Sequence, residues 1–300
     1  MPEASLSDPR VGTGSVPDAT LGRAALEAAR DDRILPLTRG VAILVVPFLL
    51  VAFGLLYVQP GRAAELFAWP IKPQLTAMLL ASAYLGGVVF FSTLLVSRAW
   101  HRIALGVPPV ATFASLLLVT TLIHRDLFSF DRVAGWTWTL IYVLAPPLVV
   151  AAWLLNRRRD PGRRPSDALV PPIVARGMVV VGVVAIGCAV LLYAVPDLFI
   201  GTWPWRMTPL SARVIASMLC LPGVLAIGIA IDRRRSAIRS PLVAQAVAIV
   251  AMLGAMWTRQ ADLTGPAASV AFMWFVVGGS LAGTVALLIM YREPAAGRGA

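Results

Sequence analysis

The sequence reads Trp69-Pro70-Ile71-Lys72-Pro73-Gln74-Leu75-Thr76-Ala77 at the start of one long apolar run. It reads Trp203-Pro204-Trp205-Arg206-Met207-Thr208-Pro209-Leu210-Ser211-Ala212 at the start of another. Each stretch joins a Trp-Pro pair to a cation two residues after the proline. A second proline then falls near the first helical turn, where its missing N–H leaves no hydrogen bond unmade. The two stretches predict two equivalent points at which the chain begins a membrane helix.

The composition is that of a polytopic membrane protein. Of the 300 residues, 58% are hydrophobic and only 14% are charged, and the mean hydropathy is +0.79. A soluble domain carries about 25% charged residues. The net charge of +11 comes from arginines in short segments beside apolar runs, where basic residues set orientation, so we expect a lipid bilayer and no nucleic acid as partner.

Eight apolar runs predict an all-α integral membrane protein with eight transmembrane helices. At a rise of about 1.5 Å per residue, most of them are long enough for a hydrocarbon core of about 30 Å. They cover residues 40–58, 74–97, 107–124, 135–156, 177–195, 209–231, 241–258 and 268–291.

The distribution of basic residues predicts the orientation. Both chain ends and the alternate loops that lie on the same side hold 19 arginines, whereas the opposite loops hold six basic residues. Because basic residues are retained on the inner side of a membrane, we expect a multi-pass protein of the cell (inner) membrane with both termini in the cytoplasm. Both Trp-Pro stretches then lie outside.

The chain has the pattern of an internal duplication at a nearly constant spacing. An even number of helices in each half predicts two parallel four-helix repeats, 39–159 and 176–292, joined by a cytoplasmic linker, 160–175. We expect a disordered cytoplasmic N-terminal tail at 1–38 and a C-terminal tail at 293–300. The matched residues are Arg39-Gly40 and Arg176-Gly177, Leu55-Leu56-Tyr57 and Leu191-Leu192-Tyr193, Leu66-Phe67 and Leu198-Phe199, Thr76 and Ser211, Arg98 and Arg233, and Arg157 and Arg292.

Helix-breaking or small residues recur at matched depths. Gly86-Gly87 corresponds to Pro222-Gly223, and Pro146-Pro147 to Gly278-Gly279. Such interruptions indicate either a binding site at mid-membrane or close helix packing. Gly279 to Gly283 also forms a GxxxG pattern, and such small-residue faces suit a protein partner or a homo-oligomer.

The candidate ligand-binding residues are Lys72, Arg206, Arg213, Trp69 and Trp203. Cations beside the positive end of a helix are unfavourable unless an anion or an acidic side chain relieves them. The partner is then either an anionic ligand or the nearby acids Glu65 and Asp197. We expect Arg213 to point outward beside Arg206, within reach of Asp197 or of a shared cleft.

Other chemistry is not indicated by the sequence. His101 and His124 are expected at opposite membrane faces, too far apart to share a haem or a metal ion. Cys188 and Cys220 fall inside apolar runs and are expected to be packing residues. Most tryptophans fall near helix ends and are expected in the interfacial aromatic belt. We predict no catalytic residue, no metal site and no cofactor.

Three functions remain open at this stage. A transporter or permease-like protein for a small or amphipathic solute is favoured by the matched interruptions, and a non-catalytic subunit or scaffold of a larger complex is the alternative. A membrane enzyme acting on a lipid-linked substrate is the third. Ion-coupled carriers usually need intramembrane carboxylates, and none of the eight runs contains one.

The predicted topology can be tested by cysteine labelling. In a background without Cys188 and Cys220, single cysteines placed in 59–73 and in 157–176 should react with a membrane-impermeant maleimide from opposite sides. Labelling of both segments from the same side would contradict the eight-helix arrangement.

Overall fold

The computed structural model describes residues 31–163 and 167–291, and within these ranges it is helical apart from loops and one isolated bridge between Leu169 and Arg234. Eight helices are long and apolar enough to cross a membrane, which confirms the predicted number and indicates a multi-pass membrane protein. They are α2 (Pro36–Phe53, continued by η1, a π-helical turn at Gly54–Val58), α4 (Gln74–Val96), α5 (Val107–Ile123), α6 (Val133–Arg157), α7 (Pro172–Ala194), α9 (Pro209–Asp232), α10 (Arg235–Thr258) and α11 (Ala267–Met290).

Short helical turns occupy the connections. Proline starts several helices as expected, at the first positions of α2, α5, α7 and α9. The short elements are η2 (Pro60–Arg62), α3 (Ala63–Leu66), η3 (Trp100–Arg102), η4 (Ala104–Gly106), η5 (Arg125–Leu127), α8 (Asp197–Ile200) and η6 (Gln260–Asp262).

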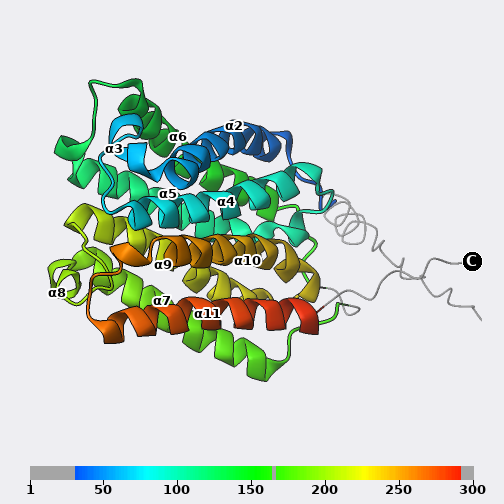
Figure 1. Cartoon of the computed structure of the whole chain (residues 1–300). Helices are drawn as coiled ribbons and strands as arrows, with labels where there is room; N and C mark the ends of the chain where they lie inside the picture. Colours follow the sequence, from blue (N-terminus) through cyan, green and yellow to red (C-terminus); the bar gives the residue numbers. More distant parts are fainter. Residues whose placement is uncertain (1–30, 164–166, 292–300) are drawn as a thin grey trace, which may run out of the picture.

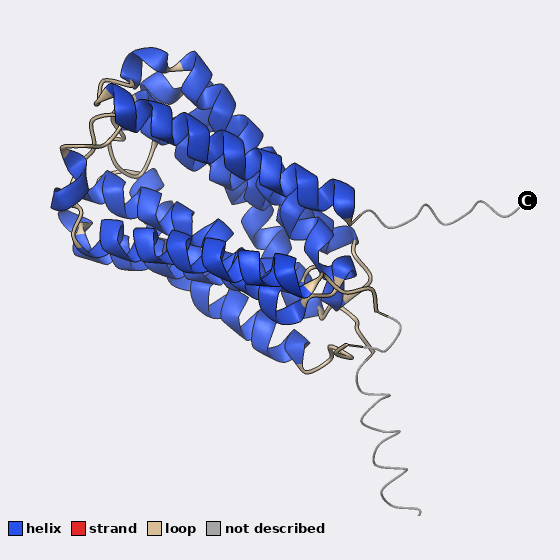
Figure 2. Ribbon diagram, turned by 90° about the horizontal axis from the view of Figure 1, so that it is seen from below, coloured by secondary structure: helices blue, strands red, loops and turns tan. Residues whose placement is uncertain are grey.

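The long helices run roughly parallel to one another and form an elongated bundle (Figures 1 and 2). The central helices α4, α5, α9 and α10 are the most buried of the eight, whereas α11 is the least buried. Helices α2 and α6 lie on one side of the centre, and α7 and α11 lie on the other (Figure 1). The side chains left exposed on the outer helices are mostly Val, Leu, Ile and Phe, as a lipid-facing surface requires.

Helix packing joins the two halves of the chain through the centre. Within each half, the first long helix packs on the second, α2 on α4 and α7 on α9. The third packs on the fourth, α5 on α6 and α10 on α11. Between the halves, α4 packs on α10 and α9 packs on α5. The packing of the two halves differs in one respect, because α2 also packs on α6 whereas α7 and α11 make little or no contact.

The bundle has two ends with different chemistry (Figure 1). The basic end consists of segments 31–35, 97–106, 158–163, 167–171 and 232–235. The Trp-Pro end consists of segments 59–73, 124–132, 195–208 and 259–266 and carries the short helices α3 and α8. This alternation of loops between two ends agrees with the order expected from the sequence.

Two glycines allow the central helices to approach closely. A Cβ atom on Gly86 would lie 2.9 Å from Ala248 Cβ and 3.0 Å from the Ala244 carbonyl oxygen, so α4 and α10 meet almost backbone to backbone. A Cβ on Gly223 would lie 2.8 Å from Ile186 in the α7–α9 contact. The positions predicted as either site or packing residues therefore serve packing here. Gly279 is different, since nothing lies within 4 Å of its added Cβ.

A buried arginine ties the connection between α6 and α7 to the turn between α9 and α10. Arg234 is 4% exposed and donates two hydrogen bonds of 2.8 Å to the Asp160 carboxylate and two of 2.7 Å to Asp232. Burial by itself would raise the pKa of Asp160, but hydrogen bonds from Arg234 and from the Gly162 N–H hold it below its usual value. Arg163 donates to the last carbonyls of α9, including that of Asp232 at 2.7 Å.

Residues 31–38 are ordered, although we expected residues 1–38 to form a disordered tail. Asp32 accepts hydrogen bonds from the Trp100 N–H at its carbonyl and from the His101 N–H at its carboxylate, and His101 Nδ1 lies 2.5 Å from the same carboxylate. Buried Asn156 accepts from the Leu35 N–H at 3.0 Å and donates to the Thr38 hydroxyl. These partners satisfy the backbone just before α2. The predicted tail residues 1–30 and 293–300 lie outside the described residues, and α7 begins inside the range predicted as linker.

Close packing at Gly86 can be tested by comparison with Gly279, which has open space around it. Gly86→Leu should lower the thermal unfolding midpoint in detergent, because overpacking a tight contact costs on the order of 1–3 kcal/mol. Gly279→Leu, where the added side chain meets open space, should leave the midpoint close to that of the unchanged protein. Equal shifts for the two variants would contradict the close approach of α4 and α10.

Candidate functional site

An open cleft at the Trp-Pro end brings together the two cations singled out in the sequence. Lys72 and Arg206 line it from different halves of the chain, with a volume of about 520 Å³. Three loops form its wall: 59–73, 203–208 and 259–266. The remaining lining residues are Pro60, Gly61, Ala64, Ile71, Pro73, Gln74, Met207, Thr208 and Asp262.

Each cation is held by its place just before a central helix. Pro73 is the N-cap of α4 and Pro209 is the first residue of α9, so Lys72 and Arg206 lie on the extended chain that leads into each helix. Both side chains are exposed, and neither forms an ion pair within 31–163 and 167–291. Of the two acids considered as partners, Glu65 lies 3.8 Å from Arg62, and Asp197 forms no ion pair with either cation among the described residues.

The positive ends of the two helices are already capped by the protein. Asp262, from the loop between α10 and α11, accepts the Leu75 N–H of α4 at 2.9 Å. The Thr208 hydroxyl accepts the Ser211 N–H of α9 at 3.2 Å. These contacts satisfy first-turn donors and offset the helix dipole. Neither of these caps involves Lys72 or Arg206.

Gln74 adds an unsatisfied group to the lining of the cleft. Its Oε1 atom is buried and has no hydrogen-bond partner among the described residues. A buried acceptor without a donor is unfavourable by about 1–3 kcal/mol.

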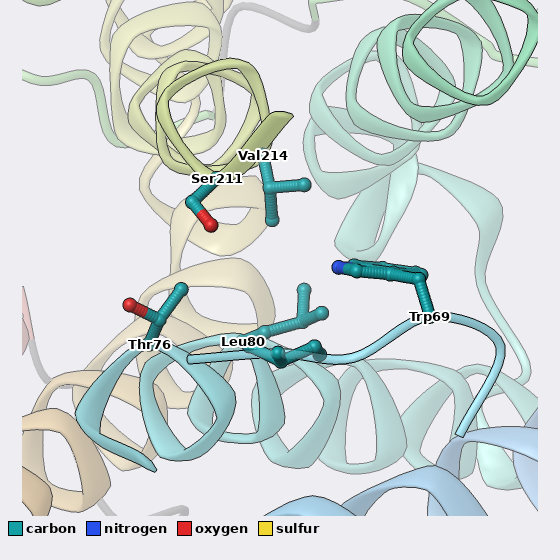
Figure 3. A pocket seen from close by; sticks show the side chains of 6 residues that line it. Trp69, Thr76, Leu80, Ser211 and Val214 are labelled. Carbon is teal, nitrogen blue, oxygen red and sulfur yellow. The ribbon is translucent and has the colours of Figure 1, made fainter. Parts of the chain in front are cut away.

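A narrow gap lies beside the cleft, between α4 and α9 (Figure 3). Trp69, Thr76 and Leu80 face Ser211 and Val214 across it, and Ile71 lines both the gap and the cleft. The gap is too narrow to hold a water molecule. Its side chains therefore pack closely between α4 and α9 beside the cleft.

The tryptophans are more buried than an interfacial belt requires, which corrects the sequence-based expectation for several of them. Trp69 and Trp205 are each 2% exposed, and the Trp205 indole N–H donates to the Thr76 hydroxyl at 2.8 Å. Trp138 is equally buried and packs edge-on against Trp69, with ring centres 4.7 Å apart. Trp136 and Trp257 are exposed, as expected for the belt.

Trp203 does not line the cleft. Its ring packs edge-on against Trp205 at 5.5 Å, and its buried indole nitrogen has no partner among the described residues. The backbone of Trp203 lies against Gly265, where an added Cβ would come within 2.0 Å of the Trp203 carbonyl oxygen. Trp203 therefore helps to fix the loop that carries Asp262.

Arg213 also lies outside the cleft lining and does not reach Asp197. Its guanidinium Nη1 hydrogen-bonds His124 Nε2 at 2.8 Å, joining α9 to the end of α5. Because a guanidinium only donates, His124 must accept through a neutral ring. Burial and the nearby positive charge of Arg213 lower the pKa of His124, against an opposing effect of Asp126. The expectation that Arg213 would lie with Arg206 in a shared cleft is wrong.

The two histidines lie at opposite ends, His101 at the basic end beside Asp32 and His124 at the Trp-Pro end. Within residues 31–163 and 167–291, no cluster of histidine, cysteine and acidic side chains is suited to a metal ion. Cys220 is buried, but Cys188 is exposed on α7.

Sequence reasoning missed Asp262 and Gln74 as cleft residues. Asp262 is distant in sequence from Lys72, and only the packing of α10 on α4 brings them together. One signal was present, since Asp262 is one of few acids in the loops of that end.

No protein-family model, curated protein or solved structure matches this chain.

The Arg213–His124 contact predicts a pH dependence of stability. The lowered pKa means that folded His124 binds a proton less readily than an unfolded histidine, whose pKa is about 6.5. Folded-state stability should therefore fall as the pH drops below about 6.5 and through the lowered pKa. His124→Gln keeps an acceptor that does not titrate, so its unfolding midpoint should fall less between about pH 7.5 and about pH 5.

Arg213→Gln provides the matched comparison, because it removes the charge that opposes protonation of His124. Its midpoint should also depend less on pH in this range. If the unchanged protein, His124→Gln and Arg213→Gln lose the same stability on acidification, the pair does not control the response.

Proposed function

We propose that the protein is a permease-like protein of the cell membrane that takes a small or amphipathic solute into the cleft at the Trp-Pro end. The observation that carries the proposal is the meeting of Lys72 and Arg206, from the two halves, in one cleft of about 520 Å³. Ligand clefts usually measure about 300–1,000 Å³. Ile71 lines both this cleft and the narrow gap between the first turns of α4 and α9.

The proposal includes two parallel four-helix repeats. Support comes from two hydrogen bonds made by the matched residues Tyr57 and Tyr193. The Tyr57 hydroxyl donates to the Ala251 carbonyl in the second half, and the Tyr193 hydroxyl donates to the Leu116 carbonyl in the first half. The short turns η5 and η6 begin 135 residues apart, at Arg125 and Gln260. The second helix of each half packs on the third helix of the other half, α4 on α10 and α9 on α5. This reciprocal packing also fits a two-fold axis along the membrane normal.

The Trp-Pro pairs of the sequence match Trp69 with Trp203, but the packing suggests a different correspondence. Trp205 donates to Thr76, and Trp69 faces Ser211, which matches Thr76. Trp69 would then correspond to Trp205, and Lys72 to Thr208. The two cations would thus occupy unlike positions in the two stretches.

Passage would require the gap to open. Trp69 and Ile71 close it in this structure, so the proposal assigns them the role of a barrier between the cleft and the interior of the bundle. Without a carboxylate inside the apolar runs, coupling to protons or sodium ions is disfavoured. We therefore propose a facilitator, or a permease component driven by a partner.

The orientation is part of the same proposal. Arginines concentrate at the basic end, so that end faces the cytoplasm and the cleft opens to the outside.

A second candidate function, that of a membrane subunit, is favoured by α11. Gly278, Gly279 and Gly283 have nothing within 4 Å of an added Cβ, and α11 packs mainly on α10. Such a face allows close approach of another membrane helix. Gly283→Leu should then release a partner that co-purifies with the unchanged protein in mild detergent, whereas substitution of Lys72 should not.

Transport can be tested with the full chain in proteoliposomes. Addition of acetate, octanoate or inorganic phosphate should produce a transient current on a solid-supported membrane for at least one of them. Lys72→Gln and Arg206→Gln should each reduce that current at least ~5-fold, because each removes a cation from the cleft. Arg125→Gln is the matched control, since Arg125 is an exposed cation of the same end outside the cleft lining.

A folded, correctly inserted protein that gives no current with any of these anions would remove the permease assignment. Equal loss of current in Arg125→Gln would show that general surface charge, rather than the cleft, is responsible.

A further inference from the structure

We infer that the ligand of the cleft is an amphipathic anion whose phosphate or carboxylate group lies between Lys72 and Arg206. This inference rests on the proposed function only for the choice of site, because it concerns binding and not passage. It is built from the charge balance, the lining and the size of the cleft.

The charge balance favours an anion. Lys72 and Arg206 contribute two positive charges and Asp262 one negative charge, so the lining is net positive. Asp262 is also engaged, because its Oδ2 accepts the Leu75 N–H. A phosphate or carboxylate would receive charge-assisted hydrogen bonds from both cations, of the kind that are shorter and stronger than neutral ones.

The lining favours a molecule with an apolar part. Six of the eleven lining residues carry no polar side-chain group, and two of these, Ile71 and Met207, are largely buried in the wall of the cleft. At the level of a membrane surface, a ligand with a charged head and an apolar chain can satisfy both kinds of lining at once. A fully hydrophilic anion would leave the apolar wall against water.

The size of the cleft leaves room for more than a bare inorganic ion. A cleft of about 520 Å³ has the dimensions of an organic ligand site. A single small anion would occupy only a fraction of it and would leave most of the lining hydrated. The volume is therefore best filled by a headgroup together with the first part of a chain.

The inference can be tested by binding to the purified full chain in a neutral detergent, with quenching or enhancement of tryptophan fluorescence as readout. The probes are dioctanoyl phosphatidate, dodecyl phosphate, glycerol 3-phosphate and dioctanoylglycerol. Phosphatidate, dodecyl phosphate or both should bind at least ~10-fold more tightly than the headgroup alone or the uncharged lipid, a difference of about 1.4 kcal/mol. Preference for phosphatidate indicates a membrane lipid as source, and preference for dodecyl phosphate indicates a soluble amphiphile.

Variants separate the cleft from general surface charge. Lys72→Gln and Arg206→Gln should each weaken binding of the preferred probe at least ~5-fold, whereas Arg125→Gln should change it less than ~2-fold. Both cleft side chains are exposed, so these variants should retain the unfolding midpoint of the unchanged protein. The inference is overturned if glycerol 3-phosphate binds as tightly as the chain-bearing probes, or if Arg125→Gln has the same effect as the cleft variants.

The binding test and the transport test can fail separately. Tight binding that depends on Lys72 and Arg206, without any current in proteoliposomes, removes the permease assignment and leaves the ligand class standing. A current that depends on these residues, without selective binding of chain-bearing anions, overturns the ligand class and leaves the permease assignment standing.

Discussion

The close contact of α4 with α10 is the interaction on which the rest of the structure depends. Gly86 removes a side chain at the point where the backbone of α4 meets Ala244 and Ala248. Lipid chains are as apolar as leucine side chains, so helices in a membrane associate through close packing rather than through burial from water. This contact holds the second helix of one half against the third helix of the other and makes the two halves one bundle.

The position of the cleft follows from that contact. Because α10 lies along α4, the loop that follows α10 reaches the start of α4, where Asp262 caps the Leu75 N–H. The same loop meets the Trp203 backbone at Gly265, so the approach to α9 is held beside the approach to α4. Lys72 and Arg206 are brought into one cleft by backbone packing and capping, without an ion pair between their charges and an acid of the described chain.

Charged side chains have different roles at the two ends of the bundle. At the basic end, Arg234 is enclosed by Asp160 and Asp232, and Arg163 neutralises the carbonyl end of α9. A buried arginine with two carboxylates is fully used in holding the chain and has no capacity left for a ligand. At the Trp-Pro end, the acid caps a helix and the cations face solvent, so this end keeps a net positive cleft that can accept an anion.

The sequence by itself determined the eight apolar helices, their order and the proline-bounded starts of α4 and α9, because these depend on local composition and on backbone geometry near each residue. It also singled out Lys72 and Arg206. Only the tertiary structure decided that these two share a cleft with Asp262 and Gln74, that Arg213 pairs with His124, and that Trp69 and Trp205 are buried. Each of these outcomes depends on which helices lie side by side. In an apolar bundle, that choice is made by small differences in surface shape at residues such as Gly86 and Gly223, which a pattern of hydrophobicity does not record.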